Sequence, residues 1–527
     1  MRPKGKFRMT APIPTLPATP PASPANRVGM RGWAALAVLM LPVLLVSVDN
    51  TVLNFALPAV SEDLTPSGTQ LLWMIDIYPL VLAGLLVSMG SLGDRVGRRK
   101  LLLIGSAGFG VVSIIAAFSS SIELLIGARA VLGLFGAMLM PSTLSLLRNI
   151  FQNRDQRRLA VAIWASGFAA GSALGPVIGG VLLEHFWWGS VFLIAVPVLV
   201  PLLILAPFLV PESRDPHPGR LDLLSIVLSL ATMFPLVYGI KHAATEGVDL
   251  IAVLCIAVAV LAGVGFVRRQ SRIETPMIDM ALFRIPQFSG AILVNLFSVI
   301  ALVGGLFFVT QHLQLVLGLS PLRAGLILVP GLVTMIVAGL VIVPVASRVQ
   351  PSIVVPIALG FSALGYGAIG LSGGDITAAG IALCFIALGL GIGSAETVSN
   401  ELVLAHAPAE KAGAASAVSE TAYELGAVLG TAILGTILTA SYRNAVVVPD
   451  GLSAEQSRAA SETLGGAVSV AGELPGKVGD ALLQSARVAF DSGVGFAAWV
   501  GFGLIVAAGV IAALALRNVR GSSEASQ

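Results

Sequence analysis

Long apolar runs alternate with short polar breaks along nearly the whole chain. From residue 33 onward, the breaks separate fourteen apolar segments. A helix needs about 20 apolar residues to cross the hydrocarbon core of a bilayer, and most of these segments have that length. The pattern therefore predicts an all-α integral membrane protein with fourteen transmembrane helices. The predicted spans are 33–58, 70–92, 101–120, 122–146, 159–183, 188–210, 221–240, 249–267, 286–312, 321–346, 350–371, 376–400, 412–441 and 492–516.

The composition agrees with this prediction. The chain of 527 residues is 56% hydrophobic and only 11% charged, with a mean hydropathy of +0.92. A soluble protein keeps about a quarter of its residues charged, so this chain has too few charges to cover a water-facing surface. Its two cysteines, Cys255 and Cys384, lie within apolar runs, where we expect small buried hydrophobes rather than a disulfide framework or metal ligands.

Two segments differ from the apolar helices. Residues 1–32 are basic and rich in proline, threonine and alanine, which predicts a disordered cytoplasmic tail. The apolar run that follows is too long for a cleaved signal peptide, so we expect it to remain as the first transmembrane helix. In the long connection 442–491, charges interrupt apolar residues at helical spacing. This predicts two short amphipathic helices on the outer face, with a loosely packed linker as the alternative.

The positions of the basic residues orient the helices. With a cytoplasmic N-terminus, most of the 31 lysines and arginines fall in cytoplasmic segments, as the positive-inside rule requires. Both termini, including the tail 517–527, are therefore expected inside. The outside loops would then hold Lys241, Arg323, Arg443, Arg458, Lys477 and Arg487.

Ionisable residues within the predicted spans usually mark a transport pathway or a proton relay. The set comprises Asp49, Asp76, Arg129, Glu420 and Glu424. Glu420 and Glu424 are four residues apart and share a helix face, where two carboxylates in a low dielectric disfavour double ionisation. That arrangement suits a proton carrier. It also suits an organic cation, with Trp73 and Tyr423 offering aromatic faces. For any single acid, a structural polar contact between packed helices is the alternative.

Other polar residues are expected at the margins of the membrane. Glu396 and Glu401 lie near the predicted inner end of their helix, where we expect solvated side chains. All five histidines fall in predicted loops or at helix ends, which argues against a buried histidine relay or a metal-dependent hydrolase.

Two glycine-rich stretches stand out. GSLGDRVGRRK, at 90–100, predicts a tight turn with an ion-pair cluster, and its residues of interest are Gly90, Asp94, Arg95, Gly97, Arg98 and Arg99. GFAAGSALGPVIGG, at 167–180, predicts close helix packing and a proline kink. Gly167, Gly171 and Gly175 share one face, followed by Pro176, Gly179 and Gly180. Generic helix packing is the alternative for this second stretch.

These stretches together resemble the major facilitator superfamily, and specifically its fourteen-helix drug:proton antiporters. The first glycine stretch is similar to the motif between helices 2 and 3, and GSALGPVIGG is similar to the antiporter motif of helix 5. LIGARAVLGLFGA, at 125–137, resembles the helix 4 motif, in which Arg129 would be the basic residue linked to proton transfer. DNTVLNFALP, at 49–58, resembles the helix 1 signature. PSGTQLLWMIDIYPLVLAG and AYELG are similar to the QacA/SmvA group, which exports quaternary ammonium compounds, dyes and other lipophilic cations.

The resemblance implies two six-helix bundles built of inverted repeats, with the substrate site between them near the middle of the membrane. The bundles would span 33–210 and 286–516, and 211–285 would hold two inserted helices with flanking loops. Asp49, Asp76 and Glu420 fall where that group has functional acids. There are two departures, namely Met335, where QacA-type members can carry an acid for divalent cations, and the additional acid Glu396.

The expected function is export of lipophilic cationic drugs, such as quaternary ammonium compounds, dyes and biguanide-type antiseptics, driven by the proton gradient. Asp49 would face the central cavity and alternate between a proton and a substrate cation, with Arg129 setting the protonation of nearby acids. The cluster around Asp94 would latch the two halves, and the helix 5 glycines would let them rock. The transporter is expected to be a monomer in the plasma membrane, without cofactor, metal or nucleic acid.

Two alternatives remain open from the sequence. The same fold could export a natural antibiotic, an amphipathic lipid or a metabolite. A membrane-embedded enzyme or receptor is the other class, but no buried nucleophile, histidine pair or metal cluster is visible in the sequence. No predicted cytoplasmic loop is long enough for a soluble output domain.

Overall fold

The computed structural model describes residues 28–517, apart from 215–221, 246, 274–275, 347, 373–375 and 407–411. Within these residues the chain is almost entirely helical and contains no β-strand. Fourteen helices in this part are long and apolar enough to cross a membrane. The predicted all-α membrane fold is therefore confirmed.

The helices fall into a first half, an inserted pair and a second half. The first half holds α1 (Met30–Leu64), α2 (Gly68–Val96), α3 (Arg98–Ala117), α4 (Ile122–Ile150), α5 (Arg154–His185), the short α6 (Ser190–Leu193) and α7 (Ala195–Leu209). The inserted pair is α8 (Leu223–Thr245) and α9 (Leu250–Gln270). The second half holds α10 (Pro286–Gln311), α11 (Pro321–Ala346), α12 (Pro351–Ser372), α13 (Ala378–Ala405), α14 (Ala412–Gly430), α15 (Thr436–Ala445), α16 (Ala454–Glu462), α17 (Leu464–Glu473) and α18 (Gly476–Ala515).

Two short irregular segments interrupt the second half at its transmembrane helices. The π-helical η2 (His312–Val316) extends α10, and the π-helical η4 (Thr431–Gly435) joins α14 to α15. A π turn widens a helix locally, and such turns often lie at functional sites.

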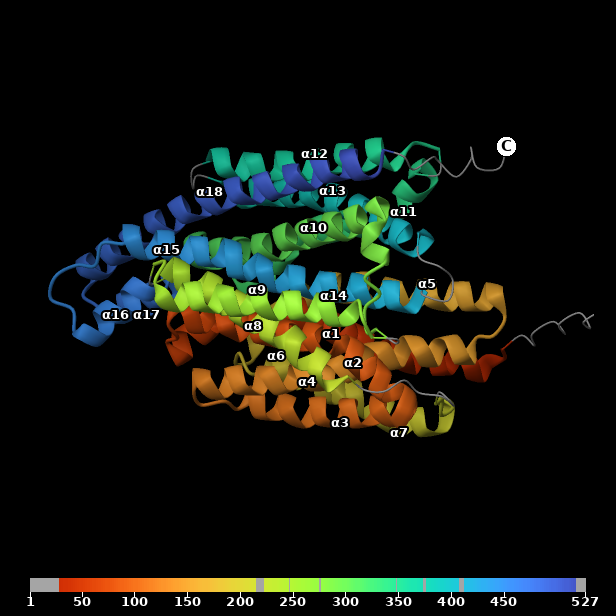
Figure 1. The fold of residues 1–527 in the computed structure, drawn as a ribbon. Helices are drawn as coiled ribbons and strands as arrows, with labels where there is room; N and C mark the ends of the chain where they lie inside the picture. The colour runs from red at the N-terminus through yellow and green to blue at the C-terminus, as the bar shows by residue number, and fades with distance from the viewer. Residues whose placement is uncertain are drawn as a thin grey trace, which may run out of the picture.

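Figure 1 shows the two halves side by side, with the helices of each running roughly parallel. The short helices α16 and α17 lie at one end of the molecule, which we call the hairpin end. Helix α1 begins and α18 ends at the opposite end, which we call the terminal end. The inserted helix α8 lies against α2 of the first half and against η4 and α15 of the second, so it touches both halves.

The two ends of α2 show how the sequence sets the helix boundaries. At its start, the Ser67 hydroxyl accepts from the backbone N–H of Gln70 (3.2 Å), and the Gln70 side chain accepts from the N–H of Ser67 (2.9 Å). This reciprocal cap satisfies two N–H groups that the helix leaves unpaired. At its other end, Gly97 alone separates α2 from α3 with a φ of 115°, a conformation that favours glycine.

The two short helices predicted in 442–491 are present as α16 and α17, and the hairpin end around them is packed. Leu464, Ala467 and Val470 of α17 are buried. The Tyr442 hydroxyl donates to the carbonyl of Ala460 (2.7 Å). Helix α18 begins at Gly476, well before the predicted start of the last span at 492, because its first turns continue beyond the apolar segment.

Close contacts join the two halves near the hairpin end. A Cβ atom at Gly180 of α5 would overlap the backbone of Leu322 of α11 at 2.5 Å, so these helices touch backbone to backbone. The Gln314 side chain donates to the carbonyl of Phe55 (3.3 Å). The Gly68 N–H donates to the Glu462 carboxylate (3.3 Å), which ties the α16–α17 region to α2. These contacts close the molecule at the hairpin end.

Candidate functional site

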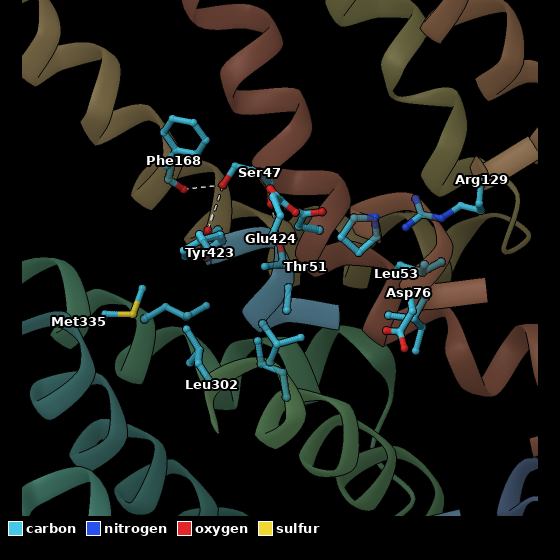
Figure 2. Close-up of a pocket in the computed structure, with 18 residues that line it drawn as sticks. Ser47, Thr51, Leu53, Asp76, Arg129, Phe168, Leu302, Met335, Tyr423 and Glu424 are labelled. Atoms are coloured by element: carbon cyan, nitrogen blue, oxygen red, sulfur yellow. Dashed lines mark hydrogen bonds between the residues drawn. The ribbon is translucent and has the colours of Figure 1, made fainter. Parts of the chain in front are cut away.

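A cavity of about 870 Å³, part of it open to solvent, lies between the two halves. Its walls come from α1, α2, α4 and α5 on one side and from α10, α11 and α14 on the other. Figure 2 shows Glu424 near the centre of the view, Arg129 and Asp76 to one side, and Met335 and Leu302 on the apolar wall. An apolar cavity with a few convergent polar groups is typical of a site for a small organic molecule.

The first acid, Asp49, is bound by Arg129. The Nη1 of Arg129 lies 2.6 Å from the Oδ2 of Asp49, and the two side chains are 2% and 9% exposed. The Nε of Arg129 donates to the carbonyl of Met74 (3.3 Å), and its guanidinium lies 4.6 Å from the centre of the Tyr78 ring. The pair therefore joins α1, α2 and α4 within the first half.

This geometry differs from the expected position of Asp49, which was predicted to face the central cavity. The cavity wall includes Asn50, Thr51 and Arg129, and Asp49 is not among its residues. Successive residues of a helix point about 100° apart, so the neighbours of Asp49 face the cavity while Asp49 itself turns toward α4. The Asp49 carboxylate lies against the guanidinium group of Arg129, and Arg129 is the member of the pair that lines the cavity.

The second acid, Asp76, is bound by Lys241 of the inserted helix α8. The Lys241 Nζ lies 2.8 Å from the Oδ2 of Asp76, and the two side chains are 1% and 0% exposed. Lys241 was expected in an outside loop, and that prediction is wrong. Helix α8 continues to Thr245, beyond the predicted end at 240, and so carries Lys241 into the protein interior.

Trp73 is also placed differently from the prediction. It was expected to offer its ring to a substrate, but it is not among the residues that line the cavity. Its ring centre lies 4.2 Å from the Nζ of Lys241 and 6.4 Å from the ring centre of Tyr238. Trp73 therefore belongs to the contact between α2 and α8. Tyr423, the other predicted aromatic contact, lines the cavity.

The glutamates of the second half differ from both aspartates. Glu424 is 2% exposed and lines the cavity together with Asn50 of the first half. Glu420 is half-buried one turn away and does not line the cavity. Glu396 is half-buried, and its Oε1 atom is enclosed by protein. Among the described residues, none of these three glutamates has an ion-pair partner.

The solvated position expected for Glu396 is wrong. Helix α13 continues to Ala405, so Glu396 lies about 14 Å from the helix end by the usual rise per residue. Glu401, nearer to that end, is exposed as expected.

The glycine motif of α5 packs against both halves. Cβ atoms at Gly171 and Gly179 would lie 2.6 Å from Ser47 and Val52 of α1, and Gly167 and Gly175 approach Met40 and Thr51 in the same way. Gly180 faces Leu322, and the carbonyl of Pro176 lies 2.5 Å from the Cβ position of Gly325 on α11. The predicted close packing is therefore present, toward α1 along most of the motif and toward the other half at its end.

The loop around Gly97 forms the predicted ion pair, but its partners lie within one half. Arg98 and Asp94 are 2.7 Å apart, and Arg98 also donates to the Ser213 hydroxyl (3.1 Å). The backbone N–H of Arg99 donates to Glu212 (3.0 Å), while Arg95 is exposed and Gly90 packs near Pro141. In this conformation, the described hydrogen-bond partners of the cluster belong to α7 and the segment after it, and a latch to the second half stays a prediction.

Sequence reasoning missed two buried partners. His312, expected at a helix end, is 1% exposed and lies 2.9 Å from Asp491 of α18, because the helical path continues through η2. Lys241 had a detectable signal, since Met233, Val237 and Lys241 recur every four residues and all three are buried. That spacing defines one face of a helix.

The Major Facilitator Superfamily model matches residues 39–431, which is most of the chain. The chain belongs to the Major Facilitator Superfamily. It is 59% identical to the multidrug efflux pump LfrA of Mycolicibacterium smegmatis, over 89% of this chain and 93% of LfrA. It is 38% identical to the methyl viologen resistance protein SmvA of Salmonella typhimurium, over 87% of this chain and 93% of SmvA. These relatives confirm the predicted type of protein, an MFS exporter of the cell membrane and not an enzyme.

Two further comparisons bear on cargo and fold. The tetracenomycin C resistance and export protein of Streptomyces glaucescens is 35% identical over 90% of each chain. A crystal structure of a bacterial homologue of the human lysosomal transporter Spinster superposes with a TM-score of 0.61. It is 16% identical, covers 93% of this chain and 97% of that one, and supports the MFS fold alone.

Proposed function

We propose that this MFS transporter exports lipophilic organic cations in exchange for protons. The observation that carries the proposal is Glu424, a 2% exposed carboxylate in the wall of an apolar cavity with no ion-pair partner among the described residues. An isolated buried carboxylate is costly unless it holds a proton or a cation. Glu424 therefore suits a site that takes a proton and an organic cation in turn.

The relatives support this class of cargo. Methyl viologen, named for SmvA, is a flat organic dication, and LfrA is named as a multidrug efflux pump. The cavity offers matching chemistry, with Glu424 for charge, Tyr423 for an aromatic contact and an apolar wall. Quaternary ammonium compounds, cationic dyes and biguanide-type antiseptics share these properties. Met335 supplies no second acid on that wall.

The exchange cycle follows from the two ends of the cavity. With both termini in the cytoplasm, the contacts at the hairpin end would close the outer side and leave the cation to enter from the cytoplasm or inner leaflet. Protonation of Glu424 from outside would then remove the attraction and release the cation. Each charge that moves with the membrane potential contributes about 2.3 kcal/mol per 100 mV, so the proton gradient and potential can drive export without a bound cofactor.

The paired charges of the first half have a supporting role in this cycle. Arg129 and Asp49 hold each other inside the bundle, and Arg129 lines the cavity. Because Asp49 neutralises the charge of Arg129, the pair leaves little net charge in the cavity wall to repel a cation. Glu424 can therefore take a proton and a cation in turn.

Gradient-driven ethidium transport in proteoliposomes tests the proposal. We expect uptake that requires an imposed pH gradient, together with a counterflow of protons reported by an internal pH dye. Glu424→Gln, which keeps the shape but cannot ionise, should reduce this transport at least about tenfold, as loss of one essential charge contact does. Glu401→Gln is the matched control, because Glu401 is an exposed glutamate and should not matter.

A second cargo class has one observation in its favour, the 35% identity to a tetracenomycin C exporter. A neutral aromatic natural product would use the apolar wall and Tyr423 without needing Glu424. If Glu424→Gln leaves gradient-driven transport of ethidium unchanged, the cation proposal fails and competition by aromatic polyketides becomes the next test.

A further inference from the structure

Helix α8 contacts both halves of the transporter where they meet. A small apolar cluster holds it there, with Leu80 and Ala83 of α2, Met233 and Val237 of α8, and Val428 and Ala432 of the second half. Lys241 follows on the same face, one turn beyond Val237. The inserted helix therefore delivers its only described lysine to the boundary that the two halves share.

The groups around the Lys241 ammonium are of the kind that proteins use to bind organic cations. Its ammonium group contacts the Asp76 carboxylate at 2.8 Å and lies 4.2 Å from the centre of the Trp73 ring. A carboxylate combined with an aromatic face is the usual recognition chemistry for ligand cations. Asp76 also belongs to the wall of the central cavity, so this site is contiguous with the proposed cargo site.

We infer that Lys241 is a tethered cation that competes with the substrate for Asp76. In the structure its ammonium group fills the site formed by Asp76 and Trp73. A substrate cation gains Asp76 only when α8 withdraws that group, and the return of Lys241 expels the substrate again. The inference deepens the proposed function and rests on it, since it assumes that the cargo is cationic.

This exchange solves an electrostatic problem at Asp76. Both side chains of the pair are almost fully buried, and separating them would leave an isolated charge in the protein interior at a cost of several kcal/mol. Replacement of one cation by another keeps the carboxylate neutralised throughout. Asp76 then needs no proton to release its cargo, and proton coupling is left to Glu424.

The position of α8 makes such exchange mechanically possible. The helix contacts α2 of the first half and η4 and α15 of the second, so movement of one half relative to the other would shift α8. Ala432, in the π-helical η4, belongs to the apolar cluster that also contains Val237, one turn from Lys241. The second half therefore contacts α8 next to the ion pair, and movement of η4 would alter the contact between Asp76 and Lys241.

Equilibrium binding of ethidium to the purified transporter, measured by fluorescence anisotropy, tests the inference. Lys241→Met keeps the length of the side chain and removes the competing charge. We expect it to bind ethidium about tenfold more tightly than the wild type, within the usual range of coupling between linked sites. In an Asp76→Asn background, the same substitution should change the affinity less than twofold, because the contested carboxylate is gone.

Three comparisons keep the result interpretable. Arg268→Gln removes a positive charge from an exposed position of α9 and should leave ethidium affinity unchanged. If Lys241→Met does not fold, Asp76→Asn with Lys241→Gln carries no lone charge, and it should bind ethidium as Asp76→Asn does. Melting profiles confirm that each variant tested is folded.

Two outcomes overturn the inference. Folded Lys241→Met with unchanged or weaker ethidium affinity would mean that the ion pair only fastens α8 to α2. An equal gain in the Asp76→Asn background would mean that Lys241 acts by general repulsion and not through Asp76. Absence of ethidium binding by the wild type would instead overturn the proposed function, and this inference with it.

Discussion

The two halves of the transporter hold the acids of their transmembrane helices in opposite ways. In the first half, Asp49 and Asp76 each contact a buried cation of the protein, at 2.6 and 2.8 Å. In the second half, Glu396, Glu420 and Glu424 have no ion-pair partner among the described residues. Of the five acids compared, only those of the second half lack a paired cation in the part of the chain that the structure describes.

This difference separates two kinds of work that a carboxylate can do in a transporter. A paired acid can accept a new cation only by exchange, as proposed for Asp76 and Lys241. An acid without a paired cation must take up a proton or a cargo ion to be stable in an apolar setting. Under the proposed function, the second half would then carry proton coupling and the first half charge exchange.

The strongest way to break this contrast is to remove a cation from the first half. Arg129→Gln leaves Asp49 buried without its partner, a change that typically costs about 3–5 kcal/mol. We expect loss of transport together with a marked drop in melting temperature. Asp49→Asn combined with Arg129→Gln removes both charges, and it should recover most of the thermal stability without recovering transport.

The exposed Arg268→Gln serves as the control for a lost arginine, with stability and transport close to those of the wild type. If Arg129→Gln melts normally, the Asp49–Arg129 pair is not the buried, mutually dependent pair that the structure shows. Full transport by the double variant would mean that neither charge takes part in the cycle.

The opposite change would give Glu424 a paired cation. Asn50 and Glu424 line the same cavity from the two halves, so the longer side chain of Asn50→Lys should bring an ammonium group to that carboxylate. We expect ethidium affinity to fall about tenfold or more, because a charge-assisted contact of this kind is worth roughly 1.5–3 kcal/mol. Equilibrium binding by anisotropy measures the effect.

Asn50→Gln is the matched control, since it keeps the amide and adds no charge. It should bind ethidium within about twofold to threefold of the wild type, the scale of a minor packing change. Unchanged affinity in a folded Asn50→Lys variant would show that Glu424 does not hold the cargo cation.

The sequence predicts the elements of this site better than its pairings. Fourteen spans follow from the length that a bilayer demands, and acids inside those spans stand out against the apolar background. The partner of Asp49, in contrast, is 80 residues away in the sequence, and nothing local links the two. The direction in which Asp49 points also depends on how α1 is rotated in the bundle, which composition does not fix.

Lys241 is a second residue whose position the sequence pattern does not determine. A lysine at the edge of an apolar run is most simply assigned to a loop, and the helix boundary had to move by only a few residues to bury it. Glu396 was misplaced for the same reason, because α13 continues past its last strongly apolar residues. A charged residue at a predicted boundary therefore needs its helix face examined before it is given to solvent.

The smallest effect is expected outside the membrane, at the ion pair that joins the ends of the inserted helices. Arg269 donates from Nε and Nη2 to the Asp222 carboxylate, each at 2.8 Å. These hydrogen bonds lower the pKa of Asp222 to about 2, from an ordinary value of 3.8. Because the pKa is lowered on folding, the stabilisation is complete above about pH 4 and is lost as the pH falls toward 2.

Asp222→Asn should therefore cost stability at pH 7, but no more than about 1 kcal/mol, since Arg269 is partly exposed and water screens the pair. In melting curves we expect a decrease of about 1–2 °C. Ethidium affinity should stay at the wild-type value, because the change loosens the far end of α8 and not the Lys241 contact. A large gain in ethidium affinity would contradict this expectation. It would mean that the position of α8 as a whole, and not the charge of Lys241 alone, controls access to Asp76.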